Sequence, residues 1–345
     1  MAITQSRLSY IDNLRVLAFT TMVFYHACKL FSPEGWGIFL TPMPWAKLSA
    51  EIISSWRLPL LFFISGSALS LSIKKQNIAK RFAKKFLPLL IIGTPLLVSA
   101  ADFLADLHTN PNASFGLHLK EYFVNVSRGH LSWYHLWYLG YILVFVVIHQ
   151  FIHDHIRLSL PRIQLNPMFV MCVLIAFSLI SELYLRPFFP VKRDFIHDWA
   201  SIIQFACYYC AGILVINTPK MLYDLERVKL WMLVAAVLFL YIRFSDTGIP
   251  VAYTKVAVAW SVVFSLNGLF QSYLNFKNKF TIELHSRMLD IYAIHQVTLL
   301  VAAILTVAMV DSPFKVFFIF FLGFGFAYIL AVSKRQVKNL YKKFA

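Results

Sequence analysis

The chain has 345 residues, of which 59% are apolar and only 14% are charged. Soluble domains contain about 45–50% apolar and about 25% charged residues, so the composition excludes an ordinary soluble domain and a disordered protein. The net charge of +16 does not indicate nucleic acid, because no stretch outside the apolar segments mixes basic and aromatic residues. We therefore expect a membrane protein whose anionic partners are lipids or phosphate ligands.

Apolar runs bounded by charged residues or by Pro and Gly predict about ten membrane spans. In chain order they are Leu14–Phe31, Ile52–Ile73, Phe86–Leu104, Trp133–Ile152, Met168–Leu185, Ala200–Ile216, Leu230–Phe244, Val251–Leu274, Met288–Val310 and Phe314–Val332. The bias of Lys and Arg between the two sides predicts that both termini are cytoplasmic. The expected fold is an all-α polytopic membrane protein in which residues 1–345 form a single domain.

The first span carries Arg15 and His26, two side chains that are costly inside a bilayer. Eleven helical steps of about 100° bring them to nearly the same face, roughly 16 Å apart along the axis. A cation near the cytoplasmic surface can bind phosphate, and a deeper imidazole can take a proton from a hydroxyl. Alternatively, Arg15 anchors the helix at the interface by pairing with Asp12, and His26 is only hydrogen-bonded within the bundle.

Near its start the second span contains Arg57, which is followed by a deep apolar run. This indicates either the mouth of a polar cavity or an arginine that snorkels to the interface. Further along, Ser65-Gly66 allows another backbone to approach closely. Four cations precede the third span, and they either hold the phosphates of a soluble cofactor or simply follow the positive-inside rule: Lys80, Arg81, Lys84 and Lys85.

Two later spans contain further candidate site residues. The fourth begins in an aromatic belt that contains His135 and Trp137, and the ninth contains His295 next to Gln296. A His-Gln pair in an apolar helix is costly unless it is used or satisfied. The longest polar connection, from about Ala105 to Ser132, is expected outside, where it covers a site or only connects helices.

Cys207 and Cys210 have the spacing of metal ligands, but no second such pair exists, so we predict no metal site.

Four segments resemble the acyltransferase family 3 membrane proteins in their order and spacing. They are Tyr10 to Arg15 with the following gap to His26, Arg57 to Gly66, His135 to Leu139, and Tyr292 to Gln296. The second and third are most similar to the periplasmic glucan succinyltransferases. The resemblance implies a bundle in the bacterial inner membrane, without a permanently bound cofactor. It moves an acyl group from cytoplasmic acyl-CoA, either succinyl-CoA or acetyl-CoA, to a hydroxyl of an extracytoplasmic glycan.

The resemblance also implies roles for individual residues. His26 is the expected catalytic base or transient acyl carrier, and Asp12 and Arg15 act with it. The family's Arg-x-x-Arg before the third helix falls on Arg81 and Lys84, and a lysine keeps the charge but lacks the bidentate fork. The expected binding residues for acyl-CoA are Arg15, Arg81, Lys84 and Lys85, and those for the acyl group and the acceptor are Arg57, Ser65, His135, Trp137 and His295.

The main alternative is a transporter of glycans or anionic metabolites, in which buried Arg and His form substrate or proton-relay sites. Transporters usually contain paired helices interrupted by Gly or Pro in two halves, and the sequence shows no convincing pair. The acyltransferase interpretation is therefore preferred.

Overall fold

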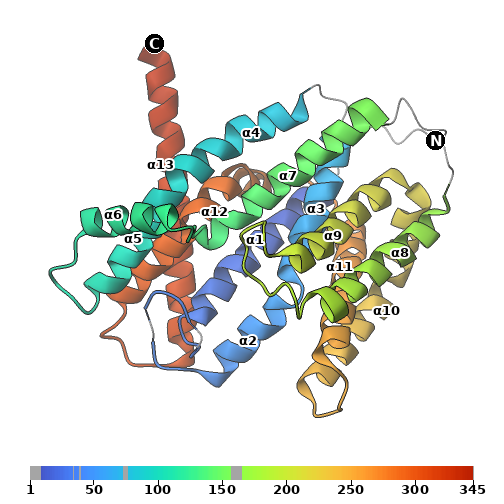
Figure 1. Ribbon diagram of the computed structural model, residues 1–345, viewed down its shortest axis with the longest axis horizontal. Helices are drawn as coiled ribbons and strands as arrows, with labels where there is room; N and C mark the ends of the chain where they lie inside the picture. Colours follow the sequence, from blue (N-terminus) through green and yellow to red (C-terminus); the bar gives the residue numbers. More distant parts are fainter. Residues whose placement is uncertain (1–8, 34, 39, 73–76, 157–164, 345) are drawn as a thin grey trace. The chain divides into compact units, whose positions relative to one another are not determined.

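The computed structural model describes residues 9–33, 35–38, 40–72, 77–156 and 165–344. These residues form α-helices, with short π- and 3₁₀-helical stretches, and contain no β-strand (Figure 1). Among them, eight helical segments are long and apolar enough to cross a membrane. The protein is therefore an all-α polytopic membrane protein, which confirms the fold class predicted from composition.

A helix lies at every one of the predicted spans. The eight long apolar segments are Pro44–Ser72, Ile78–Leu107, Tyr134–Asp154, Pro167–Leu185, Trp199–Asn217, Val251–Tyr273, Lys279–Leu305 and Pro313–Val337. The other two predicted spans fall on α1 (Ser9–Lys29) and α10 (Pro219–Phe244), which are not among these eight segments. Their crossing of the membrane, and with it the side on which the termini lie, stays a prediction.

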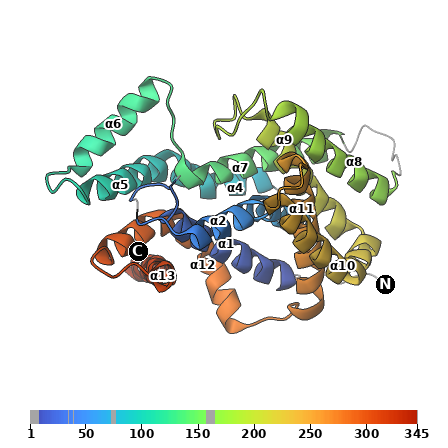
Figure 2. The same ribbon diagram turned by 90° about the horizontal axis from the view of Figure 1, so that it is seen from below.

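The helices form two compact units, each assembled from separate parts of the sequence. The first unit comprises Met1–Ala18, Ser55–Leu87 and Trp137–Asn278. In it α10 lies beside α11, and α3 lies beside α9 (Figures 1 and 2). Its elements are the start of α1, α3 (Arg57–Ser72), α4 (Ile78–Pro88), α7 (Trp137–Phe151), η3 (Ile152–Ile156), α8 (Pro167–Ile180), η4 (Ser181–Leu185), α9 (Trp199–Asn217), α10 and α11 (Val251–Tyr273).

Helices α3 and α9 are in backbone contact through two glycines. Gly66 lies against the carbonyl of Tyr209, and Gly212 lies against the carbonyl of Phe63. A Cβ added at Gly66 would lie 1.9 Å from the carbonyl oxygen of Tyr209. A Cβ added at Gly212 would lie 2.0 Å from the carbonyl oxygen of Phe63. The Ser67 hydroxyl also donates a hydrogen bond to the Gly212 carbonyl at 3.1 Å. The predicted close approach of another backbone to this part of α3 is therefore confirmed.

The second unit comprises Phe19–Ser54, Pro88–Leu136 and Lys279–Ala345. Its core gathers side chains from the end of α1, the segment that follows it, α12 and α13. Helix α12 packs against α13 and α5, and its middle turns are buried. Besides the end of α1, its elements are α2 (Pro44–Ser54), η1 (Leu89–Gly93), α5 (Thr94–Leu107), α6 (Phe115–Ser127), η2 (Tyr134–Leu136), α12 (Lys279–Leu305) and α13 (Pro313–Phe344).

The connection predicted from Ala105 to Ser132 contains a helix, α6, that was not predicted. This helix packs on α5. His118 on α6 lies 3.2 Å from the carboxylate of Asp106 on α5, and the Ser99 hydroxyl donates to the His118 carbonyl at 3.5 Å. His118 therefore helps to attach α6 to α5.

Candidate functional site

Three histidines predicted as site residues lie together in the second unit. His26 comes from α1, His135 from η2 and His295 from α12. The ring centroids of His26 and His295 are 5.1 Å apart, and those of His135 and His295 are 4.6 Å apart. Because these residues are far apart in the sequence, only the tertiary structure brings the three imidazoles into one group.

Helix α12 contributes one face to this group, with Tyr292, His295 and Gln296 at helical positions i, i+3 and i+4. His295 is fully buried, and Gln296 is 5% exposed. Nδ1 of His295 donates to the carbonyl of Tyr292 at 2.6 Å, so the lone pair of this ring lies on Nε2. The Tyr292 hydroxyl donates to the backbone carbonyl of His135, which joins α12 to η2.

His135 is 7% exposed, and a backbone carbonyl also orients its ring. Its Nε2 lies 3.0 Å from the carbonyl oxygen of Ala293. A carbonyl only accepts hydrogen bonds, so Nε2 carries the hydrogen and Nδ1 carries the lone pair. Among the described residues, no three His, Cys, Asp or Glu side chains are grouped so that they could hold a metal ion.

His26 differs from the other two rings because it is half-buried rather than buried. Trp36 donates from its indole nitrogen to the His26 carbonyl at 3.2 Å, and the two rings meet edge to face with centroids 5.7 Å apart. The amide nitrogen of Gln296 lies 3.2 Å from Nδ1 of His26. Trp36 was not predicted as a site residue, because it lies between helices and belongs to no motif.

Chemically, this group presents one accessible imidazole supported by buried polar side chains. An imidazole with a free lone pair can take a proton from a hydroxyl group near neutral pH. Of the three rings, only that of His26 is outside the buried class, so it is the most accessible of them. The arrangement therefore supports proton transfer, or a transient covalent bond, at His26.

The first unit contains a second polar group, which includes two predicted residues. The hydroxyls of Ser65 on α3 and Tyr138 on α7 are 2.7 Å apart. Tyr138 also donates to the Leu61 carbonyl at 3.3 Å, and Arg15 on α1 interacts with it electrostatically. Tyr138 was part of a recognised motif but had no predicted role, and it connects α1, α3 and α7.

Arg57, Trp137 and Asp12 are further predicted residues of the first unit. Arg57 at the start of α3 is 6% exposed, which favours a polar environment inside the protein over snorkelling to the interface. The Trp137 ring stacks on Phe205 with centroids 5.7 Å apart, and the Arg193 guanidinium lies 5.5 Å from its centroid. Trp137 is thus packed in the core of this unit. Asp12 on α1 is half-buried.

The predicted phosphate-binding cations lie on α4. Arg81, Lys84 and Lys85 are exposed, whereas Ile78 and Phe86 on the same helix are buried. This helix therefore has an apolar face toward the protein and a basic face toward its surroundings. Both interpretations of the cluster, phosphate binding and the positive-inside rule, agree with this placement.

A buried ionic network in the first unit was not predicted. Arg186 pairs with Glu182 at 3.2 Å and with Asp198 at 3.6 Å, and Lys255 pairs with the other oxygen of Glu182. The Tyr141 hydroxyl donates to Asp198 at 2.9 Å. Two cations balance two carboxylates, so the network supports structure rather than the binding of a charged ligand. The sequence did contain one signal, the i, i+4 spacing of Glu182 and Arg186.

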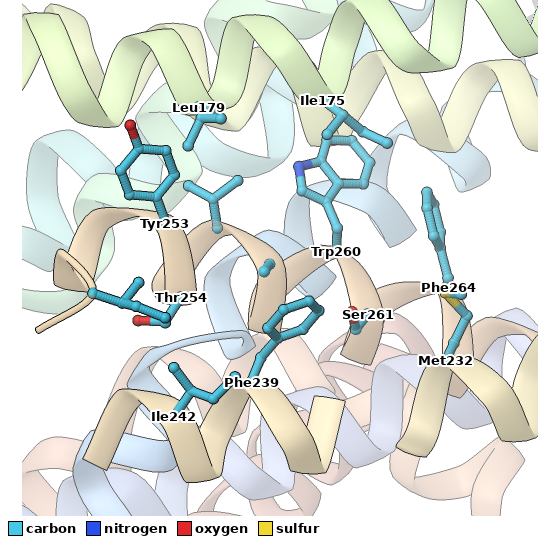
Figure 3. Close-up of a pocket in the computed structure, with 13 residues that line it drawn as sticks. Ile175, Leu179, Met232, Phe239, Ile242, Tyr253, Thr254, Trp260, Ser261 and Phe264 are labelled. Carbon is cyan, nitrogen blue, oxygen red and sulfur yellow. The ribbon is translucent and has the colours of Figure 1, made fainter. Parts of the chain in front are cut away.

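The first unit also contains an apolar cavity of about 550 Å³ between α8, α10 and α11 (Figure 3). Side chains of α8 and α10 point toward α11 across it, among them Leu179 and Phe239 (Figure 3). Among the described residues that line it, none has a carboxylate, imidazole, amine, guanidinium or thiol. The cavity has space for apolar groups but no residue suited to acyl transfer.

The sequence matches the family described as an acyltransferase domain (Acyl_transf_3) over residues 8–332. This range includes parts of both units and each of the predicted site residues. No curated protein and no solved structure matches the chain.

Proposed function

The chain belongs to acyltransferase family 3, and from this premise we propose that it moves an acyl group from cytoplasmic acyl-CoA to a hydroxyl of an extracytoplasmic glycan. Membership of the family makes the protein a multi-pass membrane enzyme of acyl transfer. The donor, the acceptor, the residue roles and a location in the bacterial inner membrane are the proposed parts.

The observation that carries the proposal is the half-buried ring of His26 among buried polar side chains of α12 and η2. As a base, His26 removes the proton of the acceptor hydroxyl while that oxygen attacks the thioester carbonyl. The ester C–O bond forms, the C–S bond breaks, and the proton passes from His26 to the departing CoA thiolate. As a carrier, a ring nitrogen of His26 would first attack the thioester carbonyl, so that a C–N bond forms, the C–S bond breaks and CoA leaves as its thiolate. The acceptor oxygen would then attack the acyl carbon, the C–N bond would break, and the released imidazole would take the hydroxyl proton.

The donor end of the proposal rests on the exposed cations of α4. CoA is anionic at its nucleotide end, and the exposed cations Arg81, Lys84 and Lys85 are of the type that binds phosphates. Arg15 is proposed as a further phosphate ligand, and Asp12 lies three residues before it on α1. Anionic lipid headgroups carry the same phosphate chemistry, so membrane lipids are expected to compete for this face.

The acceptor end is proposed to involve Arg57, Ser65, His135, Trp137 and His295. The buried guanidinium of Arg57 is suited to a succinyl carboxylate, which an acetyl group does not offer. The motif resemblance to periplasmic glucan succinyltransferases also supports succinyl transfer. Acetyl transfer remains the alternative that the experiment below distinguishes.

The test is mass spectrometry of surface and periplasmic glycans from a deletion strain that carries wild type, His26→Ala or the control His130→Ala. His130 is exposed and lies outside the histidine group. We expect a base-labile acetyl or succinyl increment with wild type and His130→Ala, and none with His26→Ala at equal abundance. Normal modification by His26→Ala contradicts the proposal. Identical, unmodified glycans in every strain make transport of an unmodified substrate the leading interpretation.

A further inference from the structure

We propose that Gln296 is a positioning residue that sets which ring nitrogen of His26 is reactive, and that His135 sets the orientation of the Gln296 amide. The inference rests on the proposed role of His26 as the base. The donors and acceptors that support it lie in series, from the backbone carbonyl of Ala293 through the side chains of His135, Gln296 and His26.

The carbonyl of Ala293 accepts a hydrogen bond from Nε2 of His135 at 3.0 Å, which leaves the lone pair of that ring on Nδ1. His135 is 7% exposed, and its Nδ1 is buried with no hydrogen-bond partner among the described residues. A buried acceptor without a donor costs about 1–3 kcal/mol, so this nitrogen requires an N–H or O–H group.

Gln296 is the neighbour that can supply one. Its amide nitrogen lies 3.2 Å from Nδ1 and 3.5 Å from Nε2 of His26, and its side chain is also a close neighbour of the His135 ring. Its Oε1 is buried and has no partner among the described residues. In this orientation two acceptors, Oε1 of Gln296 and Nδ1 of His135, both lack a donor.

A half-turn of the amide about its Cγ–Cδ bond satisfies both atoms. The turn exchanges an oxygen and a nitrogen of nearly equal size, so the surrounding packing is unchanged. The amide N–H then donates to Nδ1 of His135, and Oε1 occupies the position 3.2 Å from Nδ1 of His26. Oε1 only accepts, and at this position it lies closer to Nδ1 of His26 (3.2 Å) than to Nε2 (3.5 Å), so we assign the hydrogen of His26 to Nδ1.

The consequence concerns the chemistry of His26. With its hydrogen on Nδ1, the lone pair of His26 lies on Nε2 and can receive the proton of a substrate hydroxyl. With the amide in the opposite orientation, N–H groups would face the ring, and the lone pair on Nδ1 would already accept a hydrogen bond. The backbone carbonyl of Ala293 thus selects Nε2 of His26 as the base, through His135 and Gln296.

An isosteric pair of variants tests this role. Gln296→Glu keeps an oxygen that accepts from Nδ1–H of His26, whereas Gln296→Met keeps the length and loses the acceptor. We expect Gln296→Met to lower kcat by about 10²-fold with KM for acyl-CoA unchanged, and Gln296→Glu to stay within about tenfold of wild type. A purely structural role predicts the reverse order, because methionine suits an apolar bundle and a carboxylate does not.

The matched control is Gln271→Met in α11, which also removes a buried amide oxygen that has no hydrogen-bond partner among the described residues. We expect wild-type kcat and KM from it. Equal or better turnover by Gln296→Met than by Gln296→Glu overturns the inference.

A second readout does not depend on activity. The ¹⁵N spectrum of histidine-labelled protein, assigned by comparison with His26→Ala, should show the hydrogen of His26 on Nδ1 in wild type and lost from that position in Gln296→Met. A hydrogen on Nε2 of His26 in wild type overturns the inference. If transfer does not depend on His26 at all, the proposed function fails, while the spectrum still decides the tautomer.

Discussion

The contact between α3 and α9 allows a prediction worked from the structure. Alanine at Gly66 would place a Cβ 1.9 Å from the carbonyl oxygen of Tyr209 and 2.8 Å from its carbonyl carbon. Real Cβ atoms essentially never come within 3.0 Å of such atoms, so the two helices would have to separate by about 1 Å. The obstructing atoms belong to a helix backbone, which cannot rotate away as a side chain can.

The expected magnitude is the difference of two effects. Overpacking typically costs about 1–3 kcal/mol, and a backbone clash lies at the upper end of that range. Replacing glycine by alanine inside a helix recovers roughly 0.5–1 kcal/mol through backbone entropy. We therefore expect Gly66→Ala to lower the free energy of unfolding by about 2 kcal/mol. Gly325→Ala in α13 should be neutral or stabilising, because no neighbouring atom lies within 4 Å of its Cβ.

The assay is denaturant unfolding of the purified protein in detergent, with wild type, Gly66→Ala and Gly325→Ala compared under identical conditions. Gly212→Ala supplies a second clash at the same contact, with a Cβ 2.0 Å from the Phe63 oxygen. The reasoning is refuted if Gly66→Ala and Gly212→Ala unfold at the same denaturant concentration as Gly325→Ala.

Two further predictions concern charged residues. Glu182→Ala should destabilise the first unit by about 3 kcal/mol, because it removes a buried carboxylate from Lys255 and Arg186, whereas Lys47→Ala should cost less than about 1 kcal/mol. The ion pair of Lys47 with Glu51 is exposed, with 3.9 Å between Nζ and Oε1. Equal losses of stability in Glu182→Ala and Lys47→Ala, measured by thermal unfolding, would contradict this ranking. Lys84→Arg should lower KM for acyl-CoA by roughly two- to fivefold, since an arginine binds phosphate through two parallel N–H groups. Initial rates measure this change, and an unchanged KM would leave Lys84 with only a topological role.

The class of protein and many candidate site residues could be predicted from the sequence. Long apolar runs have few stable forms in a bilayer other than helices, and a histidine or arginine inside such a run is costly enough to stand out. His26, His135 and His295 could be selected on this ground. The helical period could likewise have placed Tyr292, His295 and Gln296 on one face of a helix, because their positions are i, i+3 and i+4.

Other features depended on tertiary packing. The partner of Gly66 could not be predicted, because a glycine allows a close approach without selecting the helix that makes it. Trp36 gave no local signal, since a tryptophan between helices is common. The packing of Trp137 on Phe205 also gave no local signal, because the two residues lie far apart along the chain.

What the sequence by itself determined is therefore a helical membrane protein with rare buried histidines, because hydropathy, helical period and the cost of burying charge are local properties. The tertiary structure decided that the end of α1, η2 and α12 meet, and that Gln296 lies beside both His26 and His135. Which nitrogen of an imidazole carries its hydrogen depends on the acceptors that surround the ring. Those acceptors come from distant parts of the chain, so only the folded protein defines them.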